Sequence, residues 1–349
     1  VFTAVSVVGD TNLASVLGLL LIVLGAGHVL SRRLHLARLP LGAPFLVLVA
    51  VLGAGVVTAA DRSNVLKDWL RLVSVAVLYL LAAEAGADAR RRAVLLGAIV
   101  LSAVAPVGVG LFQIVTGTGD PGTTGFNRIF GTFVHPSPYG FYLVTLAPLV
   151  WLVVERSRSP IVRLLAGVLL ALMVVCILST YTRAAWLGLI ITALVLTAMR
   201  NPRLSGALIL AVVAAWFLVP GIQERAGDQD TIQGKSGRFI LWTEALSTLS
   251  PAQLPLGTGL GSAEAHLGNN VHNDYLRIWV EGGVLGTSAL VVLYVAALRQ
   301  ALAVWRRAAT PLERQLATTL LAMFLARLVM FATDNILGNP VLELSLIHI

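Results

Sequence analysis

Long runs of apolar residues alternate with short polar connections along most of the chain. A helix crosses about 30 Å of hydrocarbon with roughly 20 apolar residues, so each run of that length predicts a membrane-spanning helix. Ten spans are predicted, near residues 12–30, 41–60, 69–87, 93–115, 138–155, 161–179, 184–199, 204–220, 278–298 and 315–333. We expect an eleventh to begin near Val341 and to be cut off. The predicted fold class is all-α integral membrane, a polytopic bundle of about 10–12 transmembrane helices with one large outward-facing loop.

The composition agrees with this pattern. Hydrophobic residues make up 57% of the 349 residues and charged residues only 12%, whereas soluble domains carry about 25% charged residues. The net charge of +8 does not indicate nucleic-acid binding, because the basic residues fall in short clusters between apolar segments. This distribution is typical of membrane topology.

The basic clusters predict the orientation of the chain. Of 25 basic residues, 15 lie in every second connection, beginning with the first. They are Arg32, Arg33, Arg38, Arg90, Arg91, Arg92, Arg156, Arg158, Arg163, Arg200, Arg203, Arg299, Arg306, Arg307 and Arg314. Because cytoplasmic loops are enriched in arginine and lysine, these connections are predicted to be cytoplasmic and Val1 to lie outside.

This topology divides the chain into three regions. Residues 1–220 would hold transmembrane helices one to eight, with short outer loops at 116–138 and 180–184. Residues 221–277 would form one large periplasmic or extracellular loop. Residues 278–349 would hold helices nine and ten and a truncated last span. The polar features of the sequence therefore gather on the outer face.

Two arginines on that face are candidates for binding an anion. Arg183 lies in the turn between two spans, beside Trp186. It either anchors a helix at the interface or binds a phosphate in the headgroup plane with its planar fork. Arg238 precedes an apolar stripe at helical spacing, which predicts a short helix on the outer membrane surface. Arg238 at the start of this helix either is solvated or binds an anion there. The stripe consists of Phe239, Trp242, Leu246 and Leu249.

The loop before the ninth predicted span contains a candidate proton acceptor. His272 follows Val271 in a polar stretch, and a neutral imidazole near pH 7 can accept a proton from a hydroxyl group. A polar loop or capping role is the alternative. His266 and Asp274 lie nearby, but their spacing matches no common zinc motif. We therefore predict no metal.

Two further patterns in the sequence indicate structural roles. The alternating glycines Gly257, Gly259 and Gly261 permit a tight turn and a close approach of backbone to a ligand, but no dinucleotide-binding unit surrounds them. Glu281 follows Arg277 by four residues, a spacing that permits a same-face pair on a helix.

Three residues within or beside the predicted spans complete the survey. Arg327 falls near the middle of the tenth predicted span, where it is a functional candidate or pairs with a carboxylate of another helix. Asp334 follows at the outer end of that span. Cys176, the single cysteine, lies in an apolar run and is expected to be a buried thiol.

In their order along the chain, these motifs resemble the O-antigen ligase/polymerase family. The resemblance covers roughly residues 125–290, with the His272–Leu276 motif near its end. Arg128–Phe133 with Pro136 is similar to an outer-loop pattern in which asparagines are usual where this chain has His135 and Ser137. The other matching elements are Tyr181–Gly188, Ser236–Trp242, Gly257–Gly261 and Glu281–Gly286.

The resemblance implies a metal-independent membrane glycosyltransferase that uses no cofactor. Such an enzyme moves or polymerises a glycan from an undecaprenyl-diphosphate carrier in the membrane lipid onto an acceptor hydroxyl. Its site would lie on the outer face of the bacterial cytoplasmic (inner) membrane. Catalytic roles would fall to Arg183 and Arg238, which stabilise the diphosphate leaving group, and to His272, which activates the acceptor. Substrate-binding candidates are Arg128, Asn273, Asp274 and Arg277.

The acceptor and two rival functions stay open. The acceptor could be a glycan, the lipid core of lipopolysaccharide, or a protein. The 23 arginines against two lysines indicate a high-GC genome, and this tilts the interpretation toward a polysaccharide polymerase in cell-envelope biogenesis. A transporter, for instance of bicarbonate, would place its polar features near the bilayer midplane. A non-catalytic scaffold would tolerate replacement of Arg183 and His272.

Overall fold

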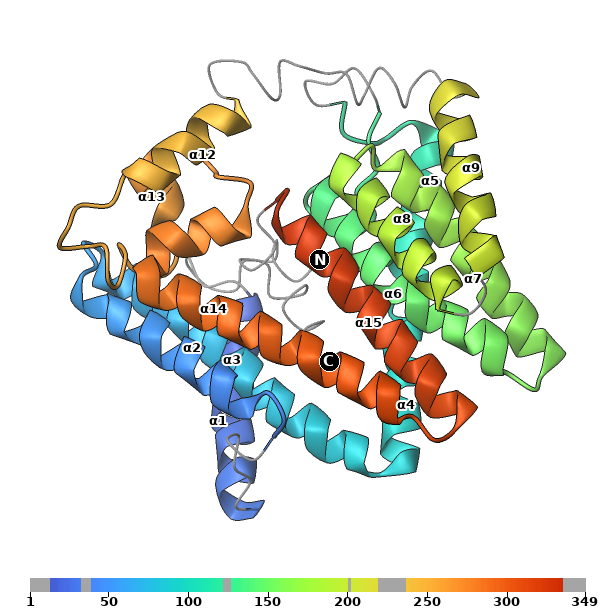
Figure 1. Ribbon diagram of the computed structural model, residues 1–349, viewed down its shortest axis with the longest axis horizontal. Helices are drawn as coiled ribbons and strands as arrows, with labels where there is room; N and C mark the ends of the chain where they lie inside the picture. The colour runs from blue at the N-terminus through green and yellow to red at the C-terminus, as the bar shows by residue number, and fades with distance from the viewer. Residues whose placement is uncertain (1–12, 33–38, 122–126, 200–201, 219–236, 335–349) are drawn as a thin grey trace.

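The computed structural model describes residues 13–32, 39–121, 127–199, 202–218 and 237–334 (Figure 1). Every regular element in these ranges is a helix, and the only β-type pairing within them is an isolated bridge between Asp120 and Arg128. The helices are α1 (Leu13–Arg32), α2 (Gly42–Ala54), the 3-10 helix η2 (Gly55–Val57), α3 (Arg62–Ala87), α4 (Ala89–Leu101), α5 (Val104–Thr116), α6 (Pro136–Arg156), α7 (Pro160–Ser179), α8 (Arg183–Ala198), α9 (Pro202–Leu218), α12 (Arg238–Ser247), α13 (Ala263–Leu267), α14 (Asp274–Arg307) and α15 (Pro311–Phe331).

The prediction of an all-α polytopic membrane protein is confirmed. In the described ranges, a helix occupies the position of each of the ten predicted spans, with α4 and α5 together forming the fourth. Six of these segments are long and apolar enough to cross a membrane: α3, α4–α5, α6, α7, α14 and α15. The segments α2–η2 and α8 are apolar but shorter. The predicted eleventh span lies outside the described residues.

Side chains at the helix starts explain why the spans begin where they do. The first backbone N–H groups of a helix have no partner within it, so a preceding acceptor side chain fixes its start. Asp61 accepts from two such amides of α3, Asp88 accepts from one of α4, and Ser159 accepts from one of α7. Thr310 forms a reciprocal capping box with Glu313 at the start of α15.

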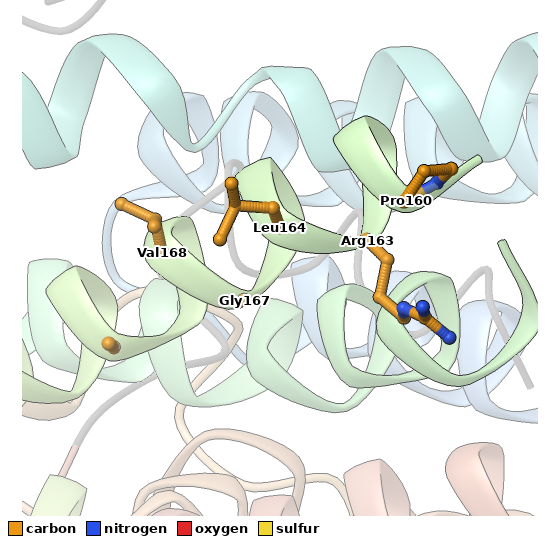
Figure 2. A pocket seen from close by; sticks show the side chains of 6 residues that line it. Pro160, Arg163, Leu164, Gly167 and Val168 are labelled. Carbon is orange, nitrogen blue, oxygen red and sulfur yellow. The ribbon is translucent and has the colours of Figure 1, made fainter.

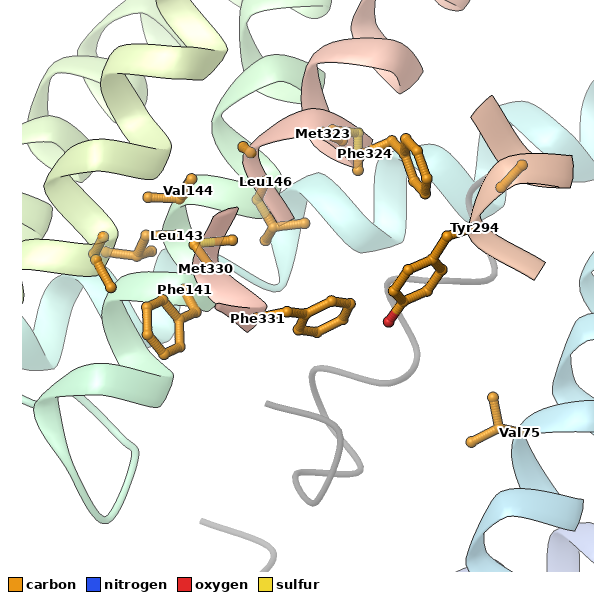
Figure 3. Packing of buried hydrophobic residues seen from close by; sticks show 14 of the residues in the cluster. Val75, Phe141, Leu143, Val144, Leu146, Tyr294, Met323, Phe324, Met330 and Phe331 are labelled. Carbon is orange, nitrogen blue, oxygen red and sulfur yellow. The ribbon is translucent and has the colours of Figure 1, made fainter. Parts of the chain in front are cut away.

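The central pair of helices is α14 and α15. Figure 1 shows α1–α3 on one side of this pair and α5–α9 on the other. α14 packs against α2, whereas α15 packs against α6 and α8. The buried apolar core follows the same contacts, and Figure 3 shows Phe141 and Leu146 of α6 near Phe331 of α15, with Tyr294 of α14 beyond.

Small residues bring α8 close to its neighbours. A Cβ atom on Gly188 would lie 2.9 Å from the Met330 sulfur of α15, and one on Gly140 of α6 would lie 2.9 Å from the Cβ of Ala185. Close packing of this kind holds helices together in lipid, where apolar burial alone gives no preference for helix association. The first residue of α8, Arg183, is therefore carried by a closely packed helix.

α14 occupies the ninth predicted span, and it is broken at Gly283, whose φ is 60° and ψ is −157°. The glycine-rich loop docks at this break. Thr258 N and Gly259 N donate to the carbonyl oxygens of Val280 and Glu281 at 2.9 and 3.0 Å. A Cβ on Gly283 would lie 2.5 Å from a loop carbonyl oxygen. The close approach that these glycines allow is thus to the protein's own backbone.

Candidate functional site

Arg183 begins α8 after a turn that is held by a second arginine. The turn contains Thr180, Tyr181 and Thr182, and Tyr181 has a φ of 48°. Arg128 is 9% exposed. Its Nε donates to the Thr180 carbonyl oxygen at 2.9 Å, and its Nη2 donates to Thr182 Oγ1 at 3.1 Å. The loop that contains Arg128 and the turn that precedes Arg183 therefore form one unit.

Arg238 begins α12 and reaches the end of α15. Its Nη1 donates to the Thr333 carbonyl oxygen at 2.9 Å. Burial lowers the pKa of Arg238, Asp334 raises it, and the positive charge of Arg183 lowers it. Arg238 is therefore within electrostatic range of both Arg183 and Asp334, although the three residues come from separate segments of the chain.

His272 pairs with a carboxylate. Its Nδ1 lies 3.0 Å from Asp334 Oδ1, and the His272 side chain is 40% exposed whereas that of Asp334 is 15% exposed. A carboxylate at Nδ1 accepts the proton there, so that the lone pair of the neutral ring is on Nε2. The backbone of His272 has a φ of 49°, and its N–H donates to Asn270 Oδ1 at 3.1 Å.

α12 also supports His272. Trp242 Nε1 donates to the carbonyl oxygen of Val271, the residue before His272, at 2.9 Å. A small apolar cluster that includes Ala245, Ala263 and Val271 joins α12, α13 and the start of α14. The prediction of a helix from Arg238 is confirmed. This helix begins with Arg238 and also contacts the segment that contains His272.

His135 is a further side chain at this site. It caps α6, where its Nδ1 accepts from Ser137 N at 3.3 Å, and the residue is exposed. Burial of part of the ring lowers the pKa of His135, as does the charge of Arg128, whereas Asp334 and Asp120 raise it. His272 adds a smaller lowering effect. A neutral His135 would present its Nε2–H as a hydrogen-bond donor.

The remaining predicted substrate-binding residues have structural contacts. Asn273 caps α14 by accepting from Tyr275 N and Leu276 N. Arg277 Nε donates to Glu281 Oε1 at 2.9 Å, so the predicted pair at this spacing is confirmed. Asp274 is fully buried, and its Oδ1 lies 4.0 Å from Arg277 Nη1. These contacts stabilise the first segment of α14.

Two predictions about interior residues can be checked directly. Cys176 is fully buried, as predicted. Arg327 is 3% exposed and faces the interior of the bundle, with its Cζ 5.3 Å from the centre of the Phe331 ring. Its role stays a prediction.

Part of the chain matches a known protein family. Residues 168–291 match the family model described as O-antigen ligase. This match supports assignment of the chain to the O-antigen ligase family. A comparison with curated proteins gives no match. The match supports glycan transfer of the ligase/polymerase type in general, and this family implies a lipid-linked glycan donor and an acceptor. With its apolar helices, the chain is a multi-pass membrane protein.

Two helix starts at this site have the charge that favours an anion. α8 and α12 both begin with an arginine, and neither has an acidic residue in its first turn or a hydrogen-bonded side-chain cap in the described structure. Helix N-termini carry partial positive charge and free amides, which favour phosphate. Among the described residues, no group of three His, Cys, Asp or Glu side chains is arranged to hold a metal.

Sequence reasoning did not assign a role in the candidate site to Asp334 or His135. Asp334 is 62 residues from His272 in the sequence, and no local pattern connects the two. Its position as an acidic residue just past an apolar span was the available signal. His135 had a weaker one, because it replaces an asparagine that is usual in the resembling pattern.

A hollow elsewhere on the protein lies toward the opposite end of α7 from the turn before Arg183. It lies on the surface of α7 and is lined by residues from Pro160 to Ala171, in the first half of that helix (Figure 2). The turn that leads to Arg183 follows the other end of α7. Figure 2 shows Leu164 and Val168 beside the hollow, with Arg163 toward the start of the helix. We assign it no role in glycan transfer.

Proposed function

We propose that the protein transfers a glycan from an undecaprenyl-diphosphate carrier to an acceptor hydroxyl at the outer face of the cytoplasmic membrane. The observation that carries the proposal is the arrangement around Arg238. Arg183 and Arg238 each begin a helix, and His272 pairs with Asp334. Arg238 is electrostatically coupled to both Arg183 and Asp334, and Asp334 holds His272. The O-antigen ligase match supports the same chemistry.

The arginines act on the leaving group. When the bond between the sugar anomeric carbon and the diphosphate oxygen breaks, negative charge develops on that oxygen. Arg183 and Arg238 stabilise this charge through charge-assisted hydrogen bonds, which bind phosphate in a forked geometry. Stabilisation that strengthens as the charge develops lowers the barrier of the reaction. These positive groups let the reaction proceed without a metal.

His272 acts on the acceptor. Its Nε2 accepts the proton of the acceptor hydroxyl as the oxygen attacks the anomeric carbon, and a new carbon–oxygen bond forms. The resulting imidazolium is stabilised by Asp334, which lies 3.0 Å from Nδ1. The products are the elongated acceptor and the carrier diphosphate, which leaves with the electron pair of the broken bond.

The acceptor that we favour is a growing polysaccharide, which makes the protein a cell-surface polysaccharide polymerase. Transfer to a lipid core or to a protein hydroxyl would use the same residues. The carrier would enter sideways from the bilayer, because its isoprenoid chain partitions into lipid.

The test is transfer by the full chain reconstituted in liposomes, with chelator present. The donor is an undecaprenyl-diphosphate-linked glycan, and released carrier and product length are measured. We expect turnover by wild type and a loss of about 10²-fold or more in kcat/KM for Arg183→Ala, Arg238→Ala and His272→Ala.

Matched controls come from the same residue types away from the site. His266→Ala replaces an exposed histidine of α13, and Arg306→Ala replaces an exposed arginine near the end of α14. Both should retain wild-type rates. Full activity of the three site variants would refute the site, and loss of turnover with chelator, restored by a divalent metal, would refute the metal-independent mechanism.

A further inference from the structure

Arg128 is a buried arginine that makes hydrogen bonds with the protein's own turn before Arg183. The residue is 9% exposed, and two of its donor groups face the turn between α7 and α8. The acceptors belong to Thr180 and Thr182, which flank Tyr181 and immediately precede Arg183. One guanidinium group thus reaches both sides of the residue with positive φ.

The turn needs such support. The left-handed region is unfavourable for a non-glycine residue, which persists there only where surrounding contacts enforce it. Tyr181 has a φ of 48°. The turn also receives a hydrogen bond from the outer loop, because Ile129 N donates to the Ser179 carbonyl oxygen at 3.2 Å. Thr182 N donates to Thr180 Oγ1 at the same distance of 3.2 Å.

The loop that contains Arg128 is itself anchored. Its backbone pairs with Asp120 in both directions, at 2.7 and 2.9 Å. The side chain of Gln113, a buried residue of α5, accepts from Phe130 N at 3.0 Å and from Gly131 N at 2.8 Å. Arg128 therefore joins two anchored segments, and its guanidinium is fixed in place before any substrate binds.

We infer that Arg128 is a positioning residue that fixes the turn before Arg183 and so aims Arg183 at the diphosphate. This replaces the sequence-based prediction that Arg128 contacts substrate. The inference rests on the proposed function, in which Arg183 binds the leaving group. It assigns the outer loop at 127–131 a part in catalysis that acts through another residue.

A double-mutant cycle tests this with the reconstituted full chain and the undecaprenyl-diphosphate-linked donor. Arg128→Met, which keeps most of the side-chain volume, should lower kcat/KM by about 10²-fold, since a displacement of about 1 Å can have an effect of that size. In the Arg183→Ala background the same substitution should have little further effect, because residues acting in one unit are not additive. Arg128→Lys should be intermediate, because an ammonium group lacks the fixed fork.

A second variant keeps the test informative if Arg128→Met does not fold. Thr182→Val removes one acceptor and leaves Arg128 in place. It should lower kcat/KM about fivefold in the wild-type background and have no further effect with Arg183→Ala. Arg306→Met is the matched arginine control.

The outcomes separate the inference from the proposed function. Multiplicative losses for Arg128→Met and Arg183→Ala would overturn the inference and return Arg128 to direct substrate contact. Wild-type activity of Arg128→Met would overturn it too. Wild-type activity of Arg183→Ala would instead refute the proposed role of Arg183.

Discussion

At the scale of single residues, backbone strain coincides with the candidate site. Tyr181 and His272 are the two non-glycine residues with positive φ among the described residues. One precedes Arg183 by two positions, and the other contains the proposed base. Conformations of this kind cluster at functional sites, where surrounding contacts hold them. For Tyr181, the contact is the hydrogen bond from Arg128 to the carbonyl oxygen of the preceding residue, Thr180. For His272, it is the hydrogen bond from its backbone N–H to the Asn270 side chain.

The pairing of His272 with Asp334 predicts the effect of replacing one carboxylate oxygen of Asp334 with an amide nitrogen. Asp334→Asn keeps the shape of the side chain but removes the charge that holds the Nδ1 proton and stabilises the imidazolium. We expect kcat/KM to fall by about 10²-fold or more, as in other histidine–carboxylate pairs. The measurement is carrier release from the undecaprenyl-diphosphate-linked donor.

The control for this change is Glu264→Gln, which removes an exposed carboxylate from the first turn of α13. It should leave the rate unchanged. Combining Asp334→Asn with His272→Ala should add little to the loss from His272→Ala alone. A full rate for Asp334→Asn, with His272 still required, would show that His272 works without a carboxylate.

At the scale of elements, the break in α14 determines where the histidine segment sits. Gly283 separates a first segment, Asp274–Gly282, from the long helix that follows, and the glycine-rich loop binds across the break. Glu281 adds a side-chain contact, because its Oε1 accepts from Ala263 N at 3.4 Å and from Arg277 Nε. The loop, α13 and the first segment of α14 therefore support His272 together.

Gly283→Ala should disrupt this arrangement. The alanine would need a positive φ, at a cost of about 1–2 kcal/mol, and its Cβ would lie 2.5 Å from the Leu254 carbonyl oxygen and 2.6 Å from Gly257 N. We expect a lower thermal unfolding midpoint in detergent and a loss of transfer activity, because the histidine segment must shift.

Gly97→Ala is the comparison, since a Cβ there meets nothing within 4 Å. It should be neutral or slightly stabilising, because alanine reduces the freedom of the unfolded chain. An unchanged midpoint and rate for Gly283→Ala would mean that the break is not required by the site.

The elements were largely predictable, and the contacts between them were not. Apolar runs about 20 residues long predict spanning helices because length and hydropathy are local properties. The break at Gly283 was missed because it depends on docking of the glycine-rich loop, a tertiary contact. The sequence also drew attention to Arg183, Arg238 and His272, but it did not pair His272 with Asp334, which only folding brings close.

At the scale of the whole molecule, the site is assembled from both inside and outside the matched region. Residues 168–291 include Arg183, Arg238 and His272. Arg128 and His135 precede that region, and Asp334 follows it, yet their contacts and charges join the same cluster. The described helices place these residues at one end of the bundle, as the predicted alternation of loops requires. The candidate site therefore combines residues from Arg128 to Asp334.

The side of the membrane on which this end lies can be measured with single cysteines. Cys176 is fully buried, so the wild-type chain should react little with a membrane-impermeant maleimide. Glu264→Cys reports on α13, which packs in the same cluster as the residue before His272. Ala309→Cys reports on the connection between α14 and α15. In intact cells we expect labelling of Glu264→Cys, and labelling of Ala309→Cys only after permeabilisation, because the arginines around Ala309 favour the cytoplasmic side. The reverse pattern would put the arginines and His272 in the cytoplasm, where an outer-face transfer reaction is impossible.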